Sequence, residues 1–118
     1  MKRIMLKSKI HHAQVSETNI DYEGSLSLDE DLMAAADMLP YEKVHVYNVS
    51  NGERFSTYLI KEEKGSRKVG VFGAAAHRAR VGHKLIVVSY VLLEDEETDF
   101  FMPKVLILGP GNTIAEIK

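Results

Sequence analysis

The Gly24-Ser25 pair has the most unusual chemistry open to it of any feature in the sequence. Because glycine has no side chain to obstruct the approach, the serine hydroxyl can attack the preceding carbonyl and turn the amide into an ester. If the ester then eliminates, Ser25 becomes dehydroalanine, and hydrolysis leaves a pyruvoyl ketone at the start of a new chain. A lone Gly-Ser pair is far more often a turn, so this chemistry needs companions elsewhere in the chain.

The segment 51–58, Asn-Gly-Glu-Arg-Phe-Ser-Thr-Tyr, contains three candidate companions. The guanidinium of Arg54 can hold a carboxylate through two hydrogen bonds, and the phenol of Tyr58 can give a proton to a carbanion. On a regular strand these two side chains share a face about 13 Å apart, and Thr57 points to the other face. By spacing alone, an exposed ion pair for Arg54 and a half-buried barrel position for Tyr58 are the commoner arrangements.

Two further segments offer groups that can bind a small ligand. The run 73–76, Gly-Ala-Ala-Ala, has almost no side chains, so a ligand can approach its backbone N–H and C=O groups. The alternative for this run is the first turn of a packed helix. Lys9 and His11 alternate onto one strand face, where they can supply positive charge near a carboxylate or simply face solvent.

Length and composition exclude several classes of protein. The 118 residues fit one domain, 1–118, and the net charge of −2 without a basic stripe argues against nucleic acid as a partner. Cysteine is absent, which excludes disulfides and thiolate sites. His11 and His12 should point to opposite faces of a strand, so no metal site is expected. The longest apolar stretch, 85–93, is too short for a membrane span and no leader is evident, so we expect a cytoplasmic protein without membrane partners.

The pattern of elements predicts a mainly β fold. The strands should be short and rich in β-branched or aromatic residues, and they are expected at 9–15, 43–49, 55–61, 68–72, 85–93 and 104–108. Asn51-Gly52 is typical of a hairpin turn. Six short strands in so small a chain favour a closed barrel. Because such a barrel is filled by its own side chains, any site should lie at its surface or between subunits.

The sequence predicts one helix from its apolar stripe and one further helical turn from local signals. The stripe is formed by Leu32, Met33, Ala36 and Leu39, with either Ser27 or Asp29 as the N-cap and Pro40 as the stop. A second helical turn is expected around residues 74–78. The acidic run 94–97 is interpreted as a solvated helix start or a loop.

Taken together, these segments resemble the pyruvoyl-dependent aspartate 1-decarboxylases, which make β-alanine for pantothenate. The matching pieces, in order, are Met5-Leu6-x-x-Lys9-Ile10-His11, Tyr22-x-Gly24-Ser25, Asp29-x-Asp31-Leu32, Asn51-Gly52-x-Arg54-Phe55-Ser56-Thr57-Tyr58, Gly65-Ser66, and Gly73-Ala74-Ala75-Ala76-His77 followed by Val81-Gly82. They run over nearly the whole chain. The resemblance implies a small double-ψ β-barrel with one or two short helices, assembled as a homotetramer with active sites between subunits.

The resemblance also implies a specific chemistry. The proenzyme would cleave itself between Gly24 and Ser25 into chains 1–24 and 25–118, with a pyruvoyl group at position 25. That ketone would form a Schiff base with L-aspartate and accept electrons as CO₂ leaves, which other enzymes achieve with pyridoxal phosphate. Neither pyridoxal phosphate nor a metal would be needed.

Residue roles carry over from the matching motifs as expectations. Ser25 and Tyr58 would be catalytic, with Tyr58 protonating the carbanion. Gly24, Ser25 and Thr57 would serve self-cleavage. Substrate binding would fall to Lys9, Arg54, Thr57, Gly73, Ala74 and Ala75, with His11 and Tyr22 in supporting positions.

Three positions depart from the family pattern. Phe72 stands where the family usually carries Asn, so an amide near the expected site becomes an apolar ring. His12 replaces a usual Arg, and His83 a usual Asp. Phe72 motivates a second hypothesis, a pyruvoyl decarboxylase acting on another acidic substrate. A third is a barrel-type binding module that never matures, although the charge argues against DNA as its ligand.

Overall fold

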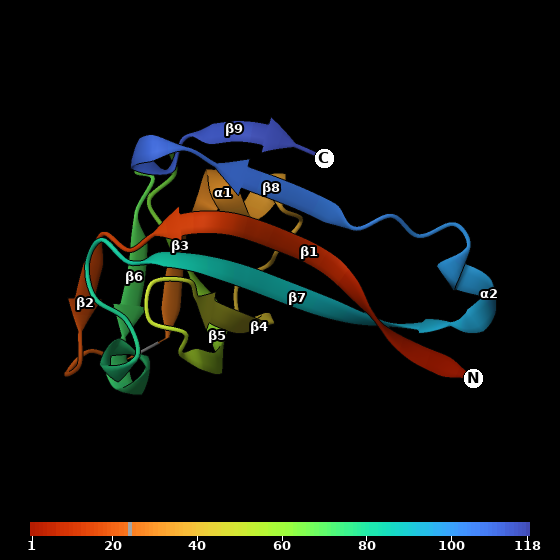
Figure 1. Ribbon diagram of the computed structural model, residues 1–118, viewed down its shortest axis with the longest axis horizontal. Coiled ribbons are helices and arrows are strands. Elements are labelled where there is room, and N and C mark those ends of the chain that lie inside the picture. Colours follow the sequence, from red (N-terminus) through yellow and green to blue (C-terminus); the bar gives the residue numbers. More distant parts are fainter. Residues whose placement is uncertain (24) are drawn as a thin grey trace.

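The computed structural model describes residues 1–23 and 25–118 and is mainly β, with two short α-helices (Figure 1). The strands are β1 Lys2–Gln14, β2 Glu17–Asn19, β3 Leu26–Asp29, β4 Lys43–Asn48, β5 Arg54–Glu62, β6 Val69–Phe72, β7 Lys84–Glu94, β8 Lys104–Leu108 and β9 Ile114–Ile117. The helical elements are α1 Glu30–Ala35, α2 Asp95–Thr98 and the 3₁₀ turns η1 Gly73–His77 and η2 Pro110–Asn112. The predicted fold class is therefore confirmed.

The sheet curls around the core, and a two-residue connection, rather than a strand pairing, links distant parts of it. Its hydrogen-bonded order, β2-β6-β3-β5-β4-β7-β1-β8-β9, is open rather than closed by a ladder. However, β1 and β2 occupy distant places in that order and are separated only by Val15 and Ser16. The N–H of Val15 donates to the carbonyl of His83 (2.9 Å), and that of Ser16 to the carbonyl of Val69 (2.8 Å). This arrangement is consistent with a double-ψ β-barrel. The expectation of a barrel closed by strand pairing throughout is wrong, because the short connection between β1 and β2 joins parts of the sheet that no strand pairing joins.

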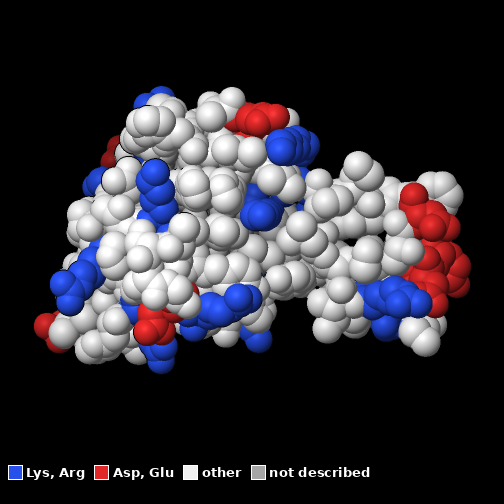
Figure 2. All heavy atoms as spheres, in the orientation of Figure 1, with Lys and Arg blue, Asp and Glu red and all other residues white. Residues whose placement is uncertain are grey.

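Strand β1 is longer than predicted because its first half lies outside the barrel. Residues 2–6 pair with residues 90–94 of β7 as a two-stranded ribbon. Figure 1 shows this ribbon projecting from the barrel with α2 beyond its tip, and Figure 2 shows acidic side chains gathered there. Pairing with β7 defines this half as a strand, although the segment itself has no clear alternation. Among the described residues, no helix has the length and apolar character needed to span a bilayer.

The helices follow their local signals, with one difference in length. Helix α1 begins after Asp29, whose carboxylate accepts from the N–H of Asp31 (2.8 Å), and it has its C-cap at Ala36. The predicted extension to Leu39 is wrong, because Asp37 adopts a φ of +56° and turns the chain. The turn predicted at 74–78 appears as η1, and the acidic run starts α2 through a capping box at Glu94.

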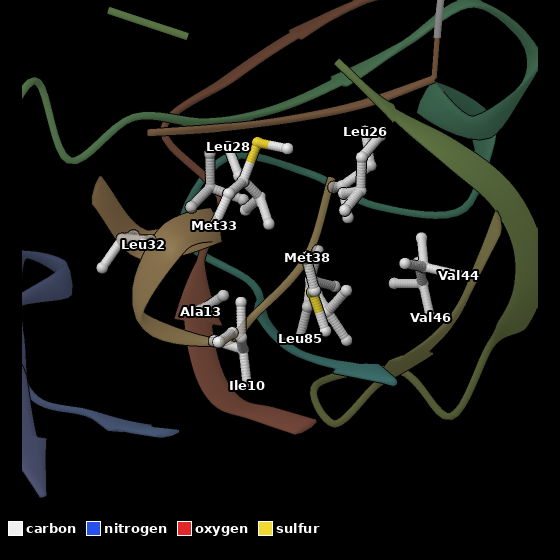
Figure 3. Packing of buried hydrophobic residues seen from close by; sticks show 14 of the residues in the cluster. Ile10, Ala13, Leu26, Leu28, Leu32, Met33, Met38, Val44, Val46 and Leu85 are labelled. Atoms are coloured by element: carbon white, nitrogen blue, oxygen red, sulfur yellow. The ribbon is translucent and has the colours of Figure 1, made fainter. Parts of the chain in front are cut away.

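The core fills the space inside the wrapped sheet (Figure 3). Its fully buried strand side chains come from seven strands, and in β4 they alternate with less buried residues. They are Ile10, Leu26, Leu28, Val44, Val46, Leu59, Val69, Val71, Leu85, Val87 and Leu106. Leu32 and Met33 of α1, with Met38, pack on the same cluster. The interior is thus occupied by side chains, as the size of the barrel predicts.

Asp29 fastens α1 to the loop between β5 and β6. Its Oδ1 accepts from the N–H groups of Asp31 (2.8 Å) and Gly65 (2.9 Å), and its Oδ2 accepts from the N–H of Arg67 (2.7 Å). Asp29 is only 1% exposed, so these donors are satisfied by one buried carboxylate.

We expect Asp29→Asn to lower the free energy of unfolding by roughly 1–3 kcal/mol. In either orientation the new amide nitrogen faces at least one backbone N–H, so a buried donor loses its acceptor. Urea unfolding checks this, with the more exposed Asp31→Asn as the matched control. Equal unfolding free energies for the two variants would contradict the role assigned to Asp29.

Candidate functional site

Ser25 lies immediately before β3 and is fully buried. Its Oγ has no hydrogen-bond partner among the described residues, while its carbonyl accepts from the N–H of Phe72 (2.8 Å). Most buried hydroxyls find a partner, so an unpartnered one at a strand end calls for an explanation. Gly24, and with it the predicted cleavage bond, lies outside the described residues.

Phe72 covers the face of β3 on which Ser25 lies. The antiparallel register pairs Leu26 with Val71 and Ser27 with Gly70, which sets Ser25 opposite Phe72. The Phe72 ring is only 5% exposed. It lies so close to Gly70 that a methyl group there would clash with the ring and with the Ser27 hydroxyl. Like the Ser25 hydroxyl, that of Ser27 has no described partner. The substitution noted in the sequence therefore stands beside the candidate nucleophile.

Tyr58 and Tyr22 lie near this same end of the sheet. The parallel register of β3 and β5 pairs Leu26 with Leu59, so Ser25 and Tyr58 each precede a paired residue. The Tyr22 ring packs against Phe72, with centroids 5.0 Å apart. A surface pocket of about 440 Å³ opens here. It is lined by Asp21, Tyr22, Glu23, Tyr41, Tyr58 and Ile60.

Thr57 faces a different pocket from Tyr58. It pairs with the core residue Val44, whereas Tyr58 pairs with the exposed Lys43, as strand alternation predicts. This second pocket has a volume of about 300 Å³. Its lining residues are Phe55, Ser56, Thr57, Ala74, Ala75 and Arg78. Gly73 opens η1 with a φ of +68°, directly after Phe72, so the Gly-Ala-Ala run turns away from β6 toward Thr57.

Arg54 and Lys9 lie on the outer face of the sheet formed by β5, β4, β7 and β1. The cross-strand register aligns Arg54 with Tyr47, and Lys9 with Val88. The Arg54 guanidinium carbon sits 4.0 Å from the centroid of the Tyr47 ring, a cation–π contact. Among the described residues, neither cation takes part in an ion pair. Both cations therefore lack a carboxylate partner within this part of the chain.

His11 and His12 stack on one another, contrary to the expectation of opposite faces. A register shift between His11 and Ala13 marks a β-bulge, and His12 has a φ of +66°. The two rings are 3.9 Å apart and nearly parallel. Partial burial lowers the pKa of His11 from 6.5, and the nearby charges of His12, Lys9 and Lys118 lower it further. His11 is therefore neutral at pH 7, so the expected positive charge comes from Lys9.

The structure divides the predicted site residues into three groups. The first group is Ser25, Tyr22 and Tyr58. The second group is Thr57, Gly73, Ala74 and Ala75. The third group is Lys9, His11 and Arg54. The first two groups adjoin one another through Phe72, and the third lies farther along the outer sheet face that also carries Tyr58. Tyr41 and Tyr47 were missed, and their only signal in the sequence is that they are aromatic residues near turns.

Comparison with known proteins gives matches along the full chain. A family described as aspartate decarboxylase matches residues 1–115. "Aspartate 1-decarboxylase" of Ralstonia nicotianae is 53% identical over 118 residues, covering 100% of this chain and 98% of the relative. The proteins of the same description from Ralstonia pickettii and Cupriavidus necator are 52% and 49% identical, each with the same coverage.

Proposed function

Since this chain belongs to the aspartate decarboxylase family, we propose that it is a lyase that decarboxylates L-aspartate to β-alanine and CO₂. We further propose a pyruvoyl group made from Ser25 as its electron sink, and a cytoplasmic role in pantothenate and coenzyme A synthesis. The single observation that carries the pyruvoyl assignment is the buried hydroxyl of Ser25, which has no hydrogen-bond partner among the described residues.

The surroundings of Ser25 fit the formation of this group. Within residues 1–23 and 25–118 the hydroxyl makes no competing hydrogen bond, and the N–H of Phe72 donates to the Ser25 carbonyl (2.8 Å). Attack of Oγ on the Gly24 carbonyl carbon breaks the amide bond and forms an ester. Loss of the Ser25 Cα proton then expels the Gly24 carboxylate and leaves dehydroalanine at position 25. Water hydrolyses this group, so that the nitrogen leaves as ammonia and the ketone remains. When present, this ketone reacts with the substrate amine and takes up the electron pair released with CO₂.

Nine other positions are assigned to substrate binding, to proton transfer or to the support of these residues. Arg54 holds a substrate carboxylate, with Lys9 nearby to add positive charge. Tyr58 gives a proton to the substrate Cα after decarboxylation. Thr57 hydrogen-bonds substrate and assists self-cleavage at the Gly24 carbonyl. Backbone groups of Gly73, Ala74 and Ala75 complete the pocket, and His11 and Tyr22 support these residues without touching the reacting atoms.

The separation of the three groups supports a site shared between subunits. Arg54 lies four residues before Tyr58, about 13 Å along the strand. Both side chains would have to lean toward one another for one aspartate to contact them, whereas the Arg54 guanidinium lies over the Tyr47 ring. We therefore propose a homotetramer in which the outer sheet face carrying Lys9 and Arg54 approaches the Ser25 end of a neighbouring subunit. Light scattering measures the mass of the assembly, and a monomer that decarboxylates aspartate would contradict the arrangement.

Intact-mass spectrometry of the denatured protein tests the pyruvoyl assignment. We expect two chains, 1–24 and 25–118, with the larger chain lighter by one ammonia than its serine form. An uncut chain that turns over aspartate would contradict the proposal.

Phe72 motivates one alternative substrate. Its ring replaces a hydrogen-bonding amide beside Ser25 and makes this end of the site more apolar. A longer acidic amino acid such as glutamate is the natural competitor. Turnover of aspartate and glutamate under identical conditions separates the two, and a higher kcat/KM for glutamate would overturn the aspartate assignment.

We expect Phe72→Asn to shorten the half-time of self-cleavage relative to Phe72→Leu. Both variants remove the buried ring, so both lose packing and should unfold more easily. Only Asn offers the Ser25 hydroxyl a hydrogen-bonding neighbour across the β3–β6 pair. Freshly synthesised protein, sampled over time by intact mass, gives the two half-times. Equal half-times would show that an amide at position 72 does not assist the serine.

A further inference from the structure

Tyr41 has a backbone conformation that is uncommon for its residue type. Its φ is +70°, in the left-handed region that favours glycine, and its side chain is 79% exposed. A bulky residue in this region costs conformational free energy, so the surrounding structure must enforce it. Because Tyr41 is largely exposed, it contributes little to the packing of the core. The reason for its uncommon backbone conformation must therefore lie in where its ring is placed.

Two backbone hydrogen bonds tie Tyr41 to the strand that carries Tyr58. The N–H of Tyr41 donates to the carbonyl of Leu59 (2.7 Å), and the N–H of Leu59 donates to the carbonyl of Glu42 (3.0 Å). Leu59 is the next residue after Tyr58 and is fully buried. The backbone of residues 41–42 is therefore registered directly beside Tyr58.

The Glu42 carboxylate fixes the other side of this loop. Its Oε2 accepts from Lys7 Nζ (3.0 Å) and from the Ser89 hydroxyl, and its Oε1 accepts from the N–H of Leu39 (3.0 Å). Lys7 also donates to the carbonyl of Asp37. Partial burial raises the pKa of Glu42, but the hydrogen bonds from Ser89, Leu39 and Lys7 outweigh it and lower the pKa from 4.5. The carboxylate is therefore ionised at neutral pH and joins residues 37–42 to β1 and β7.

These constraints place two phenol rings side by side at the mouth of the pocket. The ring centroids of Tyr41 and Tyr58 are 6.4 Å apart, with the rings inclined at 33°. That separation lies within the range of favourable aromatic pairs. Both rings line the pocket of about 440 Å³ beside Tyr22. The Tyr41 ring thus limits the directions in which the Tyr58 side chain can turn.

We propose that Tyr41 is a positioning residue for Tyr58, and that the cluster of Lys7, Glu42 and Ser89 holds it in place. The proposal rests on the proposed function, in which Tyr58 gives the proton to the substrate carbon. Proton transfer needs the phenol within hydrogen-bond reach of that carbon. A ring that is free to rotate spends less time there, so loss of Tyr41 should slow turnover more than it weakens binding.

The decisive comparison is Tyr41→Gly against Tyr41→Phe in the self-cleaved enzyme. Glycine removes the ring and accepts the positive φ, so this variant should fold, and its melting temperature checks that it does. We expect its kcat to fall about tenfold with little change in KM, because misplacement of a reacting group acts on turnover. Tyr41→Phe keeps the ring and should retain wild-type kcat. An unchanged kcat in Tyr41→Gly, or an equal loss in Tyr41→Phe, would overturn the proposal.

A readout independent of activity separates this proposal from the proposed function. In protein carrying ¹³C-labelled tyrosine, the Tyr58 ring signal is assigned by its absence in Tyr58→Phe. We expect Tyr41→Gly to shift that signal, and Tyr41→Phe to leave it close to its original position. An unmoved Tyr58 signal in Tyr41→Gly would overturn the proposal. A shifted signal in a protein that does not decarboxylate aspartate would instead reject the proposed function and leave the positioning intact.

The holding cluster is tested by Glu42→Gln, with Glu63→Gln in the exposed β5–β6 loop as the control. Glutamine keeps the shape of the side chain but weakens the bonds to Lys7 and Ser89. We expect a lower kcat, an unchanged KM and complete self-cleavage in Glu42→Gln, with no change in the control. Wild-type kcat in Glu42→Gln would exclude the cluster from this role.

Discussion

A Ser25→Ala variant is expected to remain one uncut chain of 118 residues and to show no decarboxylation of aspartate. Alanine lacks the oxygen that must attack the Gly24 carbonyl, so neither the ester nor the ketone derived from it can form. The loss should be complete rather than partial, because no other group on the chain can supply a ketone at position 25. Intact mass reports the cleavage, and β-alanine formation reports the activity.

Ser27→Ala is the matched control for this experiment. Ser27 lies two residues along the same strand face, is equally buried, and its hydroxyl likewise has no hydrogen-bond partner among the described residues. Removing it should therefore leave both cleavage and turnover in place. A cut or active Ser25→Ala protein would reject the pyruvoyl assignment. An uncut Ser27→Ala protein would show that cleavage depends on the packing under Phe72 and not on the Ser25 oxygen alone.

Elements with strong local signals were predicted well from the sequence. Strand β8 was predicted at 104–108, where the structure has it, and Gly52 adopts the positive φ that the Asn51-Gly52 turn indicated. The N-cap of α1 was narrowed to two residues, of which Asp29 is the one that caps. In each case the residues that define the element are its own, so the pattern is visible without the rest of the chain.

Strand β3 could not be predicted, because its pairing is entirely non-local. Its four residues, Leu26–Asp29, are all buried and pair with β5 on one side and β6 on the other. Its sequence, Leu-Ser-Leu-Asp, does alternate apolar and polar residues, but four residues are too few to distinguish a strand from a helix start. Its Ser27 and Asp29 were instead interpreted as helix caps, and Asp29 does serve as one from the last position of the strand.

In the candidate site, too, positions set by local patterns were predicted and positions set by distant residues were not. Regular alternation correctly set Thr57 and Tyr58 on opposite faces of β5. Alternation failed for His11 and His12, where a bulge stacks the rings. The approach of Tyr41 to Tyr58 depends on a positive φ enforced by distant partners, and no local pattern indicates it.

The second large effect is expected for Tyr58→Phe, which should cleave itself fully yet lose about 10²–10⁴-fold in kcat. The phenol oxygen is the only difference between the two side chains, and the proposed function uses that oxygen to return a proton to the substrate carbon. In the proposed function, self-cleavage uses the Ser25 hydroxyl and Thr57 instead. Thr57 faces the other pocket with Ala74 and Ala75, so maturation should not depend on Tyr58.

Separate measurements of cleavage and turnover decide between the roles open to Tyr58. Tyr41→Phe removes a neighbouring phenol whose ring lies 6.4 Å away, and it should keep normal turnover. A cut, inactive Tyr58→Phe beside an active Tyr41→Phe would assign the proton to the Tyr58 oxygen. An uncut Tyr58→Phe would move this residue into maturation. Normal turnover in Tyr58→Phe would require another donor, and Tyr22, which lines the same pocket, would be the next to replace.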